Sequence, residues 1–201
     1  MKQKGLCGVL IPAAVALIIM LIFSQIGWMF RLAQFYAIFQ SPFFTVPYDV
    51  NYFAYELLLA TAAILFLVYN FRHPVWRMGG ILLLTQVVLS IVWYIARKII
   101  ISHGNWYLIQ PYANWIYLLI VLIFCVSIIM IARSYHYGGM LVMTIIATVC
   151  NMLGVTWALC CQYIPSIPET VVTIFDGFHV FLSSLFVIIF LFMWAHRARR
   201  S

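Results

Sequence analysis

Charged side chains are scarce in this 201-residue chain, and acidic side chains are scarcest of all. Lys, Arg, Asp and Glu together make up 7% of the residues, and only 4 residues are Asp or Glu. A soluble domain draws about a quarter of its residues from this group, because water must solvate its surface. With 67% of its residues hydrophobic, this chain cannot cover itself with polar groups. The composition excludes a water-soluble domain and predicts lipid as the main solvent.

Several motifs that carry chemistry in other proteins are missing as well. The cysteines show no C-x-x-C spacing, and the chain has no phosphate-binding or dinucleotide-binding glycine motif. Its histidines do not supply two ligands at similar depth on facing helices, as a haem would require. We therefore expect no metal site and no cofactor.

Long apolar runs dominate what is present. Six of them are long enough for a helix to cross a bilayer core of about 30 Å, which takes about 20 residues. Helix breakers and polar clusters such as Arg72-His73-Pro74 separate the runs. The sequence predicts an all-α fold, a single polytopic transmembrane bundle over residues 1–201, with helices at approximately 8–30, 52–71, 78–102, 115–133, 139–163 and 170–195.

The cations predict the orientation of this bundle. With the N-terminus inside, eight Lys and Arg residues are cytoplasmic, and Arg31, Arg97 and Lys98 lie toward the outside, as the positive-inside rule requires. The predicted topology is N-in and C-in, in a plasma or inner cell membrane. The net charge of +7 then reflects topology and attraction to anionic headgroups, so we expect no nucleic-acid partner.

The few polar residues inside the predicted spans are the candidate functional residues. A charge at the middle of a membrane costs about 2.5–3.5 kcal/mol on insertion scales, so each one is a candidate site. Stripes of residues three or four apart, which share a helix face, contain the predicted substrate-binding residues Glu56, Gln86, Trp93, Arg97, Asn151, Asp176 and His179. The predicted spans place Glu56, Arg97 and Asp176 in one layer near the outer surface. Many Tyr and Trp residues fall near the same end, where they would line a pocket for a flat or cationic molecule.

This pattern favours an integral membrane protein without enzymatic activity that binds or translocates a small organic solute through an outward-facing, aromatic-lined polar pocket. It would act alone or as the membrane subunit of a larger transporter, with the predicted loop at 31–51 as a gate. One open alternative is an intramembrane enzyme that uses Glu56 or Asp176, with His179, on a lipid-soluble substrate. The other is an assembly subunit whose polar stripes only pack helices. The expected partners are the bilayer, a small-molecule or lipidic ligand, and other membrane subunits or further copies of this chain.

Overall fold

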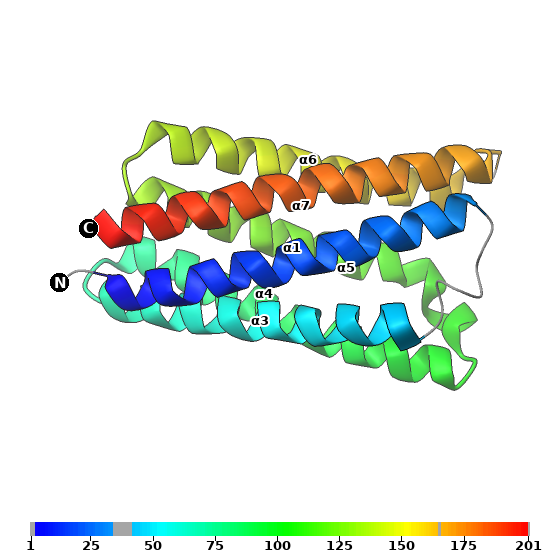
Figure 1. Ribbon diagram of the computed structural model, residues 1–201, viewed down its shortest axis with the longest axis horizontal. Helices are drawn as coiled ribbons and strands as arrows, with labels where there is room; N and C mark the ends of the chain where they lie inside the picture. The colour runs from blue at the N-terminus through cyan, green and yellow to red at the C-terminus, as the bar shows by residue number, and fades with distance from the viewer. Residues whose placement is uncertain (1–2, 34–41, 165, 201) are drawn as a thin grey trace.

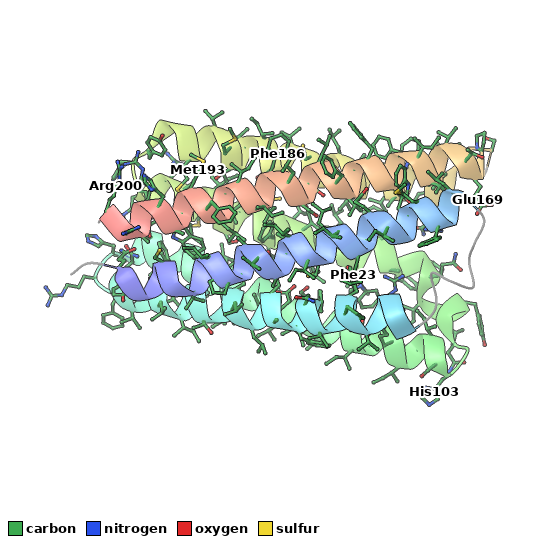
Figure 2. The ribbon with its side chains drawn as sticks, viewed as in Figure 1. Phe23, His103, Glu169, Phe186, Met193 and Arg200 are labelled. Carbon is green, nitrogen blue, oxygen red and sulfur yellow. The ribbon has the colours of Figure 1, made fainter. Side chains whose placement is uncertain are left out.

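The structure, a computed structural model, describes residues 3–33, 42–164 and 166–200. Its helices are α1 (Lys4–Leu32), α3 (Pro42–Tyr69), α4 (Pro74–Ser102), α5 (Trp106–Ser134), α6 (Gly138–Tyr163) and α7 (Glu169–Arg200). They run along the long axis of the molecule, and both chain termini lie at one end, which we call the terminal end (Figure 1). The opposite end, which carries His103 and Glu169, is the distal end (Figure 2).

All six of these helices are long and apolar enough to cross a membrane. Over the described residues, this confirms the prediction of an all-α chain with six membrane-spanning segments. Local sequence explains several helix ends. Pro74 opens α4 after an extended His73, at a position where its missing N–H costs nothing. Gly104 turns the chain from α4 into α5 at a φ of 70°, a left-handed conformation that glycine adopts without steric cost.

Two helices begin earlier than the sequence predicted. α3 starts at Pro42 instead of 52, and α5 starts at Trp106 instead of 115. Pro47 and Pro111 look like helix breakers in the sequence, yet each lies inside its helix. Both occupy the second turn, where a missing N–H removes a single hydrogen bond close to the helix end.

The earlier start of α3 also corrects the predicted loop at 31–51. Residues 42–51 are helical, so a gating loop cannot include them. Residues 34–41 lie outside the part of the chain that the structure describes. The remaining helix bounds differ from the predicted ones by little more than a turn.

The helices close into a ring. Contacts join α1 to α3, α3 to α4, α4 to α5, α5 to α6, α6 to α7, and α7 back to α1. Figure 1 shows α1 lying between α3 and α7. Each helix therefore packs mainly on its neighbours in sequence, and the first and last helices seal the ring.

Apolar side chains fill the half of the ring nearer the terminal end. Phe66, Phe190 and Trp194 are fully buried there, and the Trp194 indole N–H donates to the Tyr135 hydroxyl at 3.0 Å. The Tyr135 hydroxyl in turn donates to Gln3 Oε1 at 2.6 Å, and burial raises the pKa of this phenol, so that it keeps its proton. Small buried residues let α1 and α3 approach closely, namely Ala13, Ala14, Ala62 and Ala63. Among the described residues, this half of the ring is therefore a packed core.

Candidate functional site

The distal half of the ring holds a cavity of about 470 Å³, which we call the central cavity. All six helices contribute to its wall. Six of the seven predicted substrate-binding residues line it: Glu56, Gln86, Trp93, Arg97, Asn151 and His179. The sequence analysis built the pocket from α3, α4, α6 and α7, yet Met20 of α1 and Tyr117 of α5 also belong to the wall. Tyr117 is one of the aromatic residues predicted near this end, whereas Met20 does not stand out within its apolar run.

Asp176, the seventh predicted residue, does not line the central cavity. It lies at the seam between α1 and α7, where it interacts electrostatically with Arg31. Two side chains of α1 tie this seam together. The Trp28 indole N–H donates to the Thr173 carbonyl at 2.7 Å, and Gln25 Nε2 donates to the Gly177 carbonyl at 3.2 Å.

Glu56 lies much deeper in the bundle than the sequence predicted. Because α3 begins at Pro42, Glu56 is about 21 Å of helix rise from the distal end of α3, near the middle of the helix. Gln86 and Asn151 likewise lie near the middle of α4 and α6. Arg97 is close to the distal end of α4. The structure therefore separates the charged groups that were predicted to share one layer.

Glu56 is held by a short hydrogen-bond chain between α3 and α4. Ser90 Oγ donates to Glu56 Oε1 at 2.8 Å, and the Tyr52 hydroxyl bonds to Ser90 Oγ at 2.7 Å. Since Ser90 has one proton, Tyr52 must be the donor to Ser90. The second carboxylate oxygen, Oε2, is buried and has no hydrogen-bond partner among the described residues.

Gln86 supplies a second unsatisfied acceptor beside the cavity. Its side chain is 7% exposed, and its Oε1 has no hydrogen-bond partner in the described part of the chain. Gln86 precedes Ser90 by one helical turn, so the two side chains share a face of α4. Two buried acceptor oxygens on neighbouring helices thus border the same space.

A cluster of aromatic and charged side chains fixes α3 to α4 nearer the distal end. The Tyr52 and Tyr94 rings stack with their centroids 4.2 Å apart. The Tyr94 hydroxyl donates to Asp49, and Lys98 Nζ forms an ion pair with Asp49 Oδ2 at 2.9 Å. Asp49 was missed by the sequence analysis because it fell in a predicted loop. Its spacing of seven from Glu56, two helical turns on the same face, was the available signal.

A second cavity of about 390 Å³ adjoins the first between α1, α3 and α4. Tyr48, Tyr94 and Arg97 line both cavities. These three side chains therefore form the wall between the two cavities. The hydrogen bond to Asp49 holds one of them, Tyr94, in place.

The imidazole of His179 packs onto Gly154 of α6, so closely that a Cβ at residue 154 would overlap the ring. Its Nε2 has no hydrogen-bond partner among the described residues. Ser183 Oγ donates to the backbone carbonyl of His179 at 2.9 Å, so its proton is directed away from the imidazole. The arrangement does not orient Ser183 as a nucleophile. In the described ranges, no group of three or more His, Cys, Asp or Glu side chains is placed to hold a metal ion.

The fold and the cavity define a class, a multi-pass membrane protein whose described residues form six membrane-spanning helices around a cavity lined by apolar, aromatic and a few polar side chains. No family model, no curated protein and no solved structure matches the chain.

Proposed function

We propose that the chain binds a small organic solute in the central cavity, and that it takes part in moving this solute across a cell membrane, alone or as the membrane subunit of a larger transporter. The cavity carries the proposal, because its volume of about 470 Å³ falls within the range of about 300–1,000 Å³ that is typical of ligand sites. Its wall combines apolar and aromatic surface with a few buried polar atoms, which is the usual composition of such sites.

The unsatisfied oxygens support solute binding over a role in helix packing alone. Trp28, which joins α1 to α7, finds its partner across that interface at the Thr173 carbonyl. Glu56 and Gln86 line a cavity instead, and Glu56 Oε2 and Gln86 Oε1 lack such a partner among the described residues. Leaving a buried polar group unpaired costs about 1–3 kcal/mol, which a bound solute could recover.

The cations support an outward-facing cavity. Arg72, Arg133 and Arg199 lie near the terminal end, whereas Arg31 and Lys98 lie near the distal end. The positive-inside rule places the end with more cations in the cytoplasm. The distal half, which holds the cavity, then faces the outside.

The enzyme alternative has less support. The alternative uses Glu56 or Asp176 as its acid, and Asp176 does not line the cavity. An enzyme would have to work with Glu56 and with a His179 ring that packs against Gly154.

Cysteine accessibility tests the proposal. In a chain whose five native cysteines are replaced by alanine, Ser184→Cys places one thiol in the cavity wall on α7. We expect a membrane-impermeant methanethiosulfonate, MTSET, to label it in intact cells. We also expect an indole compound (tryptamine, tryptophol or indole-3-propionate) to slow the labelling.

Two control positions calibrate the labelling. Ser102→Cys, exposed at the distal end, should react and should not be protected. Phe192→Cys, on the exposed outer face of α7, should not react because lipid covers it. If Ser184→Cys is unreactive from both sides of the membrane, or reacts with no protection by any of the three compounds, the proposal is wrong.

A further inference from the structure

We infer that the solute is an organic cation with at least one N–H bond on its charged nitrogen, and that Glu56 binds this group at the floor of the central cavity. The floor is the part of the cavity nearest the middle of the bundle, bordered by Glu56, Gln86 and Asn151. This inference rests on the proposed function, since it names the chemical class of the solute that the same cavity binds.

Glu56 is the acidic group of the floor. Among the described residues that line the central cavity, Glu56 supplies the only carboxylate. Its side chain is 3% exposed, and the hydrogen bond from Ser90 reaches Oε1 but not Oε2. Tyr52 holds Ser90 in this position, and the Tyr52 ring is itself held by stacking on Tyr94. The carboxylate is therefore fixed with one oxygen that has no hydrogen-bond partner among the described residues, and a charged donor is the strongest kind of partner for it.

Gln86 also favours a solute that brings a hydrogen-bond donor to the floor. Its buried Oε1 is a second acceptor, one helical turn from Ser90 on the same face of α4. A carboxylate or an ether in the solute would bring another acceptor to these two oxygens and would leave all of them unpaired. A protonated secondary or primary amine carries two or three N–H groups and can satisfy both, and a protonated tertiary amine can satisfy one.

Aromatic rings favour a cation over a neutral donor. The rings in the cavity wall belong to Tyr48, Tyr52, Tyr55, Trp93, Tyr94, Tyr117 and Phe124. The face of such a ring attracts a cation within about 6 Å, and more strongly where water is excluded. Lys98 already makes this contact at the edge of the site, with Nζ 5.4 Å from the Tyr94 ring centroid.

The positive groups of the wall stand apart from the floor. Arg97 lies two helical turns, about 10 Å of rise, from Ser90 toward the distal end. A solute that also carries an anionic group would place it toward Arg97, with its ammonium at Glu56. A simple anion has no favourable position at the floor.

A matched set of four indole compounds tests the inference. Tryptamine is a cation with N–H groups, N,N,N-trimethyltryptammonium is a cation without them on the charged nitrogen, tryptophol is neutral, and indole-3-propionate is an anion. Their shared ring keeps the aromatic contacts similar. Titration calorimetry of the full chain in lipid nanodiscs should show tryptamine binding about tenfold more tightly than tryptophol, the gain typical of a hydrogen bond to a charged group. The trimethyl compound should fall between them, and indole-3-propionate should bind most weakly.

Three variants identify the groups responsible. Glu56→Gln should reduce the preference for tryptamine over tryptophol to that of the trimethyl compound, and should change the affinity for tryptophol by less than about twofold. Glu169→Gln removes the same charge from the exposed start of α7 and should leave the order of affinities unchanged. Gln86→Leu should weaken tryptamine more than the trimethyl compound, which keeps the test decisive if Glu56→Gln does not fold.

The outcomes distinguish this inference from the proposed function. Equal binding of tryptamine and tryptophol, or tightest binding of indole-3-propionate, overturns the inference, although a solute still enters the cavity. A preference for tryptamine that is undiminished in folded Glu56→Gln overturns it as well. A failure of all three compounds to protect Ser184→Cys in the labelling experiment rejects the proposed function, and the inference with it.

Discussion

The imidazole of His179 on α7 occupies the space that a side chain at Gly154 on α6 would fill. On the other side of α7, Gly177 makes the same accommodation for the Trp28 indole of α1. In both of its interfaces, with α6 and with α1, α7 therefore has a large side-chain ring packed against a glycine. The closure of the helix ring depends on Gly154 and Gly177, which have no side chain.

Gly154→Ala should destabilise the bundle. The new methyl group would overlap the His179 ring, and relieving such an overlap in a packed interior costs about 1–3 kcal/mol. Thermal unfolding in detergent should show a lower midpoint than for the unchanged chain. Gly8→Ala is the matched control, because a Cβ at that position meets nothing within 4 Å. Equal losses from both substitutions would show that the close approach of His179 to Gly154 does not matter.

Ser90→Ala should destabilise the chain more than Tyr52→Phe does. The first change leaves Glu56 Oε1 without its donor, whereas the second keeps the bond from Ser90 to Glu56. Stripping a buried carboxylate of a hydrogen bond costs about 1–3 kcal/mol, measurable as a shift in the unfolding midpoint. Thr85→Ala removes an exposed hydroxyl bonded within its own helix and serves as the control. A larger loss of stability from Tyr52→Phe than from Ser90→Ala would contradict the hydrogen-bond chain from Tyr52 through Ser90 to Glu56.

Lys98→Met should change the stability little, despite the ion pair with Asp49. The Lys98 side chain is 53% exposed and that of Asp49 is 32% exposed, so solvent screens their attraction. Exposed pairs contribute about 0–1 kcal/mol. Unfolding midpoints at low and high salt should therefore almost coincide for the variant and the unchanged chain. A large loss that disappears at high salt would show that the pair is a main tie between α3 and α4.

The topology predicts opposite accessibility for the two ends. An epitope tag after Ser201 should be protected from antibody in intact cells and exposed after permeabilisation, because the terminal end is expected in the cytoplasm. A thiol at Ser102→Cys should show the opposite behaviour. Staining of the tag on unpermeabilised cells would show that the bundle has the opposite orientation in the membrane. The cavity would then face the cytoplasm.

The sequence was sufficient for the presence of the six described helices, though not for the starts of α3 and α5, and for most of the polar lining. Both follow from length and periodicity, which depend on one segment at a time. Glu56, Gln86 and Asn151 stand on faces that a bundle must turn inward, since lipid does not solvate them. No knowledge of neighbouring helices is needed to place them inside the ring.

The depth of Glu56 and the place of Asp176 could not be read in the same way. The depth depended on whether Pro47 ended a helix, and the structure shows that it does not. Asp176 and His179 are three residues apart and so point about 60° away from each other around α7, enough to turn one toward α1 and the other toward α6. Which partner each meets is decided by packing between helices, for which one sequence carries no direct signal.

The seam between α1 and α7 also has a consequence for biosynthesis. Every other contact of the ring joins helices that leave the ribosome in succession, whereas α1 must wait for the last span before it meets its second neighbour. Until residues 169–200 have entered the membrane, Trp28 has no Thr173 carbonyl to bind, and no space for a solute is enclosed. The cavity is the last part of the molecule to come into existence, and a chain truncated after Tyr163 would be an open sheet of helices with no interior.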